Sequence, residues 1–197
     1  LVMIALLRLL VDVILGLLPF FVPAFVYMGE GMAGPVQAAI IVGAILFFPI
    51  IVSASNKYGK KKVFSIGLLS FAVFLPLGVI LPVLPIYSAG LRLAAAIACF
   101  ALLAPGAAAF LVLQRVIITD IMDFDEKITG FRREAMYNGI EGLITKFAAG
   151  LAPVVIAVNF VLFNTPDFPK GILTGFWFSA AIALIAYLIF RPYPIEK

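Results

Sequence analysis

Residues 119–146 read TDIMDFDEKITGFRREAMYNGIEGLITK, and they decide the fold because they are the one long polar interruption of an otherwise apolar sequence. Acidic side chains open this stretch, Thr129 and Gly130 give a turn signal, and two arginines follow with Glu134. The chain then returns to apolar sequence and takes a glutamate and a lysine with it. We therefore expect membrane helices on both sides of this segment.

The composition supports that expectation. Hydrophobic residues make up 64% of the 197 residues and charged residues 12%, whereas soluble domains are about a quarter charged. A helix needs about 20 apolar residues to cross a hydrocarbon core of about 30 Å. Six such runs are visible, at residues 1–27, 36–55, 63–84, 93–119, 135–163 and 171–190. The sequence predicts an all-α integral membrane protein with six transmembrane helices and no soluble domain.

Several site classes are poorly supported by the residue types present. The single Cys99 lies in an apolar run, which argues against a disulfide or metal framework, and no histidine is available as a general base. Prolines and glycines interrupt the first, fourth and fifth runs, and we expect kinks there. The first residue is not Met and already reads as the middle of a helix, so we expect Leu1 to be a cut end.

The distribution of cations predicts the orientation in the membrane. One side holds the cations of the second and fourth connections and of the tail, namely Lys57, Lys60, Lys61, Lys62, Lys127, Arg132, Arg133, Arg191 and Lys197. The other side holds Arg92 and Lys170. Positive loops stay in the cytoplasm during insertion, which predicts a plasma-membrane protein with both ends of this chain cytoplasmic. The lysines are divided among membrane loops, so we expect no nucleic-acid partner, while lipid headgroup binding by residues 60–62 stays open.

Polar residues inside the predicted spans are costly and mark function by default. The charged ones are Arg8, Asp12, Arg115, Glu141 and Lys146. Lys146 lies about 16 Å into its span, near the bilayer midplane, where a lysine costs about 3 kcal/mol. We expect it to face a watery cavity, to pair with an acid or to lose its proton, and an acid partner would come from another helix or from outside this chain. Glu141 is five residues away, about 140° around the same helix, and is not its natural partner.

The other polar residues complete a predicted binding site. Arg8 and Arg115 lie near the cytoplasmic ends of their spans, where their side chains could extend to the membrane surface. Asp12 follows Arg8 at the i,i+4 spacing and can pair with it. Amides, carboxylates and cations supply the donors and acceptors that a polar solute needs. The predicted substrate-binding residues are Asp12, Gln114, Arg115, Asn138, Glu141 and Lys146.

The polar segment resembles a known signature. DIMDFDEKITGFRREAMYNG, residues 120–139, is similar to the loop between the tenth and eleventh helices of the glycoside–pentoside–hexuronide cation symporters, the melibiose-carrier branch of the major facilitator superfamily. The matching pattern D-x-x-D-x-x-E-x-x-T-G-x-R-R-E is formed by Asp120, Asp123, Glu126, Thr129, Gly130, Arg132, Arg133 and Glu134. Lys146, the LVLQ segment at 111–114 and the basic turn NKYGKKK at 56–62 also match. The resemblance covers the whole chain as the C-terminal six-helix half of a twelve-helix fold whose N-terminal half is absent.

The resemblance implies a secondary active transporter, not an enzyme, that moves a sugar or sugar-like solute with Na⁺ or H⁺ by alternating access. No other cofactor is expected, and the partners are the solute, the lipid bilayer, and the N-terminal half or a second copy. The cation ligands are expected in the absent half, with Lys146 in the coupling network beside them. Leu111 replaces a tryptophan of some sugar carriers and Gly142 a polar residue, which leaves a lipid or another amphiphile as an alternative solute.

We interpret residues 120–134 as a cytoplasmic gating loop. Its acids and arginines lie close enough in sequence to form an ion-pair network, and a network is needed because one exposed pair contributes only about 0–1 kcal/mol.

Two other classes of protein function stay open. A Mg²⁺-dependent intramembrane prenyl transferase would use the carboxylates of Asp120, Asp123, Asp125 and Glu126, although no second acidic cluster is present, and a receptor or structural membrane protein would need no transport chemistry.

Overall fold

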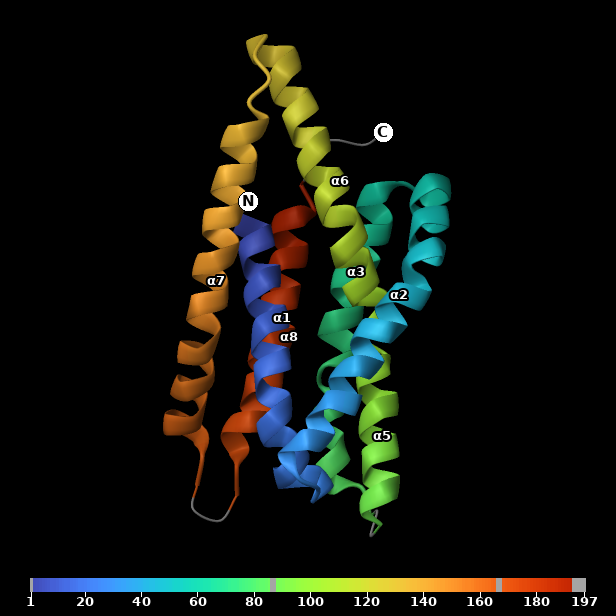
Figure 1. The fold of residues 1–197 in the computed structure, drawn as a ribbon, viewed down its shortest axis with the longest axis vertical. Coiled ribbons are helices and arrows are strands. Elements are labelled where there is room, and N and C mark those ends of the chain that lie inside the picture. Colours follow the sequence, from blue (N-terminus) through green and yellow to red (C-terminus); the bar gives the residue numbers. More distant parts are fainter. Residues whose placement is uncertain (1, 86–87, 166–167, 193–197) are drawn as a thin grey trace.

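The chain forms an elongated bundle of helices (Figure 1), and the computed structural model describes residues 2–85, 88–165 and 168–192. Leu1 and Lys197, which the sequence predictions use, lie outside these ranges. Every regular element within them is helical, and six helical segments are long and apolar enough to cross a membrane. The predicted all-α membrane architecture is confirmed for the described residues.

The observed helices follow the predicted spans closely, with shifts at their ends. The first span is α1 (Val2–Phe21) continued by a π-helical turn (Val22–Val26), and the second is α2 (Ala33–Tyr58). A 3₁₀ turn (Glu30–Met32) precedes α2, and the third span is divided into α3 (Lys60–Phe74), α4 (Leu77–Ile80) and a 3₁₀ turn (Leu81–Val83). The other helices are α5 (Ala89–Ala101), α6 (Ala104–Thr129), α7 (Glu134–Phe163) and α8 (Lys170–Phe190).

The fourth span differs from the prediction in two ways. It is divided into α5 and α6 just before Pro105, whose missing N–H is tolerated in the first turn of a helix. It also does not end at Thr119, because α6 continues to Thr129. The helix stops where Gly130 adopts a left-handed conformation with φ of 73° and donates its amide to the Glu126 carbonyl. The predicted gating loop of residues 120–134 is therefore mostly helix, and residues 130–133 alone form the connection.

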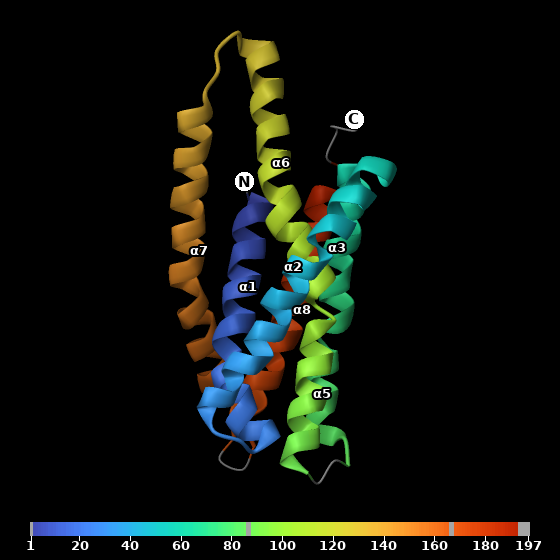
Figure 2. The same ribbon diagram turned by 45° about the vertical axis from the view of Figure 1, so that its right-hand side comes forward.

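The packing of α6 and α7 creates an opening in the bundle. α1 packs against α7 and α8, whereas α6 packs against α2 and α3. α6 and α7 are consecutive in sequence but hardly touch each other. Figures 1 and 2 show both helices protruding beyond the other helices where they join, and diverging from that connection on either side of α1.

Close contacts hold α6 firmly against α3. A Cβ added to Gly106 of α6 would lie 2.9 Å from the Gly67 carbonyl of α3 and 2.5 Å from the Ser70 hydroxyl. Likewise, a Cβ on Gly67 would lie 2.6 Å from that of Ala109. Small residues let membrane helices approach closely and gain packing energy. This contact makes α6 a fixed wall beside the opening.

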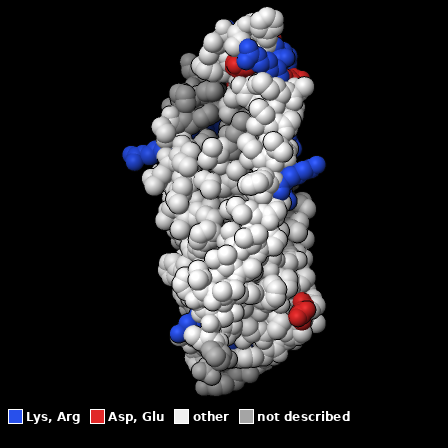
Figure 3. Space-filling model, turned by 90° about the vertical axis from the view of Figure 1, so that its left-hand side faces the viewer, with Lys and Arg blue, Asp and Glu red and all other residues white. Residues whose placement is uncertain are grey.

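Charged residues gather at the two ends of the bundle. The α2–α3 turn, the α6–α7 connection, the start of α1 and the end of α8 lie toward the same end (Figure 1), while Arg92 and Lys170 begin helices at the other. On the face in Figure 3, charged side chains lie at the tip, at both edges some way below it and near the opposite end, and the surface between these places is uncharged. This separation is what a membrane-spanning protein needs. The assignment of the more basic end to the cytoplasm stays a prediction.

Candidate functional site

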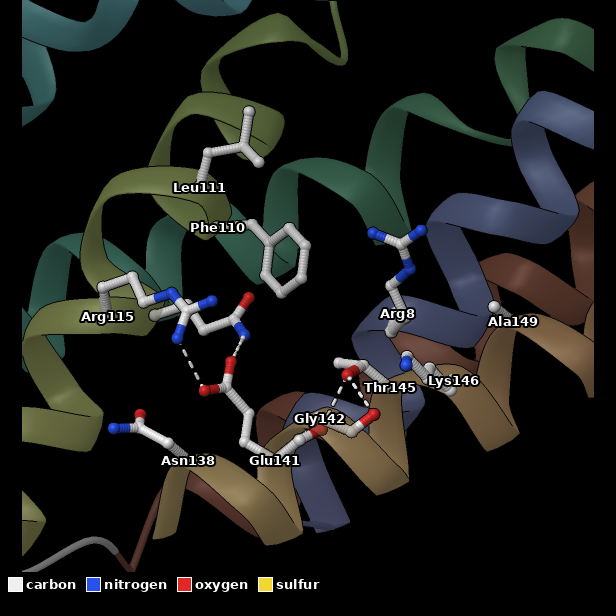
Figure 4. A pocket seen from close by; sticks show the side chains of 11 residues that line it. Arg8, Phe110, Leu111, Arg115, Asn138, Glu141, Gly142, Thr145, Lys146 and Ala149 are labelled. Atoms are coloured by element: carbon white, nitrogen blue, oxygen red, sulfur yellow. Dashed lines mark hydrogen bonds and ion pairs between the residues drawn. The ribbon is translucent and has the colours of Figure 1, made fainter. Parts of the chain in front are cut away.

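A cavity of about 580 Å³ lies between α1, α6 and α7 (Figure 4). It exists because α6 and α7 diverge on either side of α1. Its walls are formed by Arg8, Phe110, Leu111, Gln114, Arg115, Asn138, Glu141, Gly142, Thr145, Lys146 and Ala149. All predicted substrate-binding residues except Asp12 are among them.

Glu141 bridges α7 to α6 across this cavity. Its carboxylate is almost completely buried, with 4% of the residue exposed. One oxygen, Oε1, accepts a hydrogen bond of 2.9 Å from Gln114 Nε2, and Oε2 accepts one of 2.7 Å from Arg115 Nη1. A buried carboxylate is stable only when its oxygens are bonded in this way. Because the two helices hardly touch otherwise, this triad is a main connection between them.

Arg115 points across the cavity toward Glu141 (Figure 4) and forms an ion pair of 2.7 Å with it. From the sequence, this arginine could extend to the membrane surface, but in the structure its side chain reaches from α6 to Glu141 of α7. Its side chain is 70% exposed. The guanidinium therefore keeps donors available to the cavity, since five N–H groups are present and Glu141 occupies few of them.

Lys146 also lines the cavity and is exposed to it. Figure 4 places its amino group on the same side as Arg8, away from Glu141. Within the described ranges, no carboxylate lies within 4.0 Å of its nitrogen. This geometry fits the expectation that an ammonium at this depth needs an open polar space. Its counterion is not provided by the described part of the chain.

The cavity residues of α7 recur every three or four positions, as one face of a helix does. Glu141 and Lys146 both reach the cavity despite their angular separation, because it is wide enough to take in both edges of that face. Between them, a Cβ on Gly142 would meet no atom within 4 Å, so this glycine leaves open space. Thr145, which was not among the predicted site residues, lies on the same face of α7 and donates its hydroxyl to the Glu141 carbonyl at 2.6 Å.

Asp12 occupies a different place from the one predicted. It pairs with Arg8 at 2.9 Å, as the i,i+4 spacing suggested. It does not line the polar cavity, however, and faces an apolar groove of about 450 Å³ between α1 and α7. One helical turn moves a side chain along the axis by about 5.4 Å, and this shift places Arg8 in the cavity and Asp12 beyond it. Asp12 is therefore paired with a residue of the cavity wall without being part of that wall.

The predicted gate residues divide into two groups. Asp120, in α6, accepts two hydrogen bonds of 2.9 and 2.8 Å from Lys60 Nζ at the start of α3. This ion pair joins the α2–α3 turn to α6, and sequence spacing gave no sign of it because the residues lie 60 positions apart. The same ion pair engages both carboxylate oxygens of Asp120, the first of the four acids considered as Mg²⁺ ligands.

The second group surrounds Arg132 in the α6–α7 connection. Arg132 bonds to Glu134 at 2.6 Å and lies 3.8 Å from Glu126. The hydrogen bond to Glu134 raises the pKa of Arg132, helped by the charges of Glu134, Glu126 and Asp123. Thr129 donates its hydroxyl to the Asp125 carbonyl at 2.8 Å and supports the end of α6. Of the ion pairs expected among the gate residues, the structure shows here those of Arg132 with Glu134 and Glu126, which are local to this connection.

A family model described as MFS/sugar transport protein matches residues 1–196 of the chain. Comparison with curated proteins and with solved structures gives no match.

Proposed function

Because the chain belongs to the MFS/sugar transport protein family of the major facilitator superfamily, we propose that its six spans form one half of a sugar symporter. The family supports a membrane transporter in general, and the finer assignment is to the glycoside–pentoside–hexuronide branch, on the signature around residues 120–134. The solute is a sugar or sugar-like molecule, and Na⁺ or H⁺ drives its movement. The basic end faces the cytoplasm of a plasma membrane.

The polar cavity between α1, α6 and α7 is the observation that carries this proposal. Its volume of about 580 Å³ lies within the range of about 300–1,000 Å³ typical of small-molecule sites. Arg115, Asn138 and Lys146 present donors to it, and the amide oxygens of Gln114 and Asn138 can accept hydrogen bonds. A solute with many hydroxyl groups needs this mixture. The side chains of Phe110 and Leu111 add an apolar part to the cavity wall, which the carbon side of a sugar ring can contact.

The unpaired ammonium of Lys146 supports a second, coupling role for the cavity. Its charge is not balanced within the described residues, so acids from the N-terminal half, or from a second copy, are needed on the opposite wall. Such acids would provide the Na⁺ or H⁺ site, and they would place cation and solute next to each other. Binding of one would then favour binding of the other, which is the thermodynamic requirement for coupling.

Gradient-driven uptake tests the proposal. In vesicles that contain the protein, an inside-negative potential of about 100 mV contributes about 2.3 kcal/mol per cation, so we expect a labelled sugar to accumulate up to about fiftyfold. A panel of neutral glycosides, pentosides and uronides is tested with a Na⁺ or a pH gradient, and an ionophore provides the control. Equal uptake with and without every gradient would rule out coupling, and no uptake of any panel member would rule out sugar transport.

The connection between α6 and α7 fits a role as the cytoplasmic gate. Arg132, in the connection between α6 and α7, and Asp123, in the part of α6 that leads to it, are both exposed. In this position they can contact another half of the transporter when the inner side closes. The ion pairs of Arg132 with Glu134 and Glu126 would then compete with pairs across the closed interface, and alternating access requires such contacts to break easily.

Neutralising the gate should separate opening from net uptake. In Arg132→Gln combined with Asp123→Asn, we expect faster opening toward the cytoplasm and several-fold weaker net uptake, because the closed state loses its ion pairs. Opening is measured by labelling a cysteine introduced at Asn138, and uptake by the vesicle assay. Lys170→Gln, at the other end of the bundle, is the control for a change of charge alone. Unchanged labelling and uptake in the double variant would contradict the gate.

A further inference from the structure

A second opening lies away from the polar cavity, between α2 and α3. It is a groove of about 350 Å³ with Pro105 of α6 at its inner end. From Lys62 to Ser70, the groove follows α3 for about 12 Å at 1.5 Å per residue. Its walls are almost entirely apolar, and the one hydroxyl deep in it, of Ser70, is already bonded to the Gly67 carbonyl at 2.7 Å. The groove therefore favours a hydrocarbon chain over a polar solute.

Two cations lie beside Tyr58, whose ring lines the groove near the α2–α3 turn; Lys62 lines the groove itself, and Lys57 is in the last turn of α2. Lys57 Nζ lies 5.2 Å and Lys62 Nζ lies 6.0 Å from the centre of the Tyr58 ring, and both lysines are exposed. In the stretches of chain that the structure describes, neither lies within 4.0 Å of a carboxylate. Their neighbour Lys60 is different, because Asp120 neutralises it. Positive charge is thus concentrated beside Tyr58 without an acid to balance it.

We propose that this groove binds an anionic phospholipid, with the phosphate on Lys57 and Lys62 and one acyl chain along α3. The α2–α3 turn follows the end of a membrane span, which is the level of the lipid headgroups. Lysines at that level attract anionic lipids, and the groove continues from them toward the membrane centre. A free phosphate would not use the groove, and a zwitterionic lipid would gain less from the two cations. The bound lipid joins α2 to α3 and is not the transported solute.

Lipid retention in native mass spectrometry tests this site. The purified protein in detergent is mixed with dioleoyl phosphatidylglycerol, dioleoyl phosphatidylcholine or inorganic phosphate. We expect one phosphatidylglycerol to be retained in preference to phosphatidylcholine, and no effect of phosphate. Lys57→Gln and Lys62→Gln should each weaken its retention about fivefold, and the double variant about twenty-five-fold, because a lysine near anionic headgroups contributes about this factor. Lys62→Arg should retain the lipid.

Two further variants separate this site from general effects. Lys170→Gln removes a cation from the opposite end and should leave retention unchanged. Ile66→Trp, at an exposed position on the groove wall, should fill the groove and reduce retention while the lysines remain. Equal retention of both lipids, or retention unaffected in the double lysine variant, would overturn the proposal. Neither result would affect the transport proposal, because the cavity between α1, α6 and α7 shares no residue with this groove.

Discussion

Replacing Glu141 with glutamine is expected to lower the free energy of unfolding by about 2 kcal/mol and to reduce uptake at least tenfold. The carboxylate accepts one hydrogen bond from Gln114 and one from Arg115, and hydrogen bonds to a charged group contribute about 1.5–3 kcal/mol. A glutamine side chain turns one acceptor into a donor, which then faces the donor of Gln114 or Arg115. The loss of stability is moderated because solvent screens the charge of Arg115, whose side chain is 70% exposed.

A double-mutant cycle measures this interaction directly. Glu141→Gln, Arg115→Gln and the combination are compared by thermal unfolding in detergent, and we expect a coupling energy of about 1–3 kcal/mol, in the range for residues in contact. Glu30→Gln, which changes an exposed acid far from α6, should alter stability by no more than about 0.5 kcal/mol. Additive effects of the two cavity substitutions would show that the bridge between α6 and α7 does not stabilise the bundle.

The arrangement of spans was accessible from the sequence because hydropathy reports the contact of each segment with lipid. The positions of the six spans follow from uninterrupted apolar runs, and the break before Pro105 follows from the geometry of proline. Hydropathy does not report where a helix ends, however. α6 continues beyond the apolar run to Thr129, because acids spaced three residues apart are compatible with a helix in water. The signal for the true end was Gly130.

The partners of the charged residues were not accessible in the same way. The i,i+4 pair of Arg8 and Asp12 is local, so spacing along the helix was sufficient to predict it. Glu141 and Arg115 are 26 residues apart and on different helices, and their pairing depends on how α6 and α7 diverge. Sequence reasoning could place both at membrane depth, but it could not choose between a bond and exposure at the membrane surface.

Replacing Lys146 with alanine is expected to reduce gradient-driven uptake by about tenfold to a hundredfold without destabilising the protein. The loss of uptake corresponds to one charge-assisted contact with the solute or the coupling site, about 1.5–3 kcal/mol. The stability of this six-span bundle by itself should not fall, because the described part of the chain provides no carboxylate that the removal of Lys146 would leave unpaired.

A loss of uptake without a loss of stability distinguishes a functional lysine from a structural one. Uptake is measured in the vesicle assay and stability by thermal unfolding of the same preparations. Lys146→Arg keeps the charge and should retain part of the uptake, whereas Lys170→Ala, outside the cavity, should retain all of it. A structural lysine would give the reverse pattern, with lower stability in Lys146→Ala and uptake per folded molecule unchanged. That result would remove Lys146 from the coupling network and leave the bridge from Glu141 to Arg115 as the functional centre of the cavity.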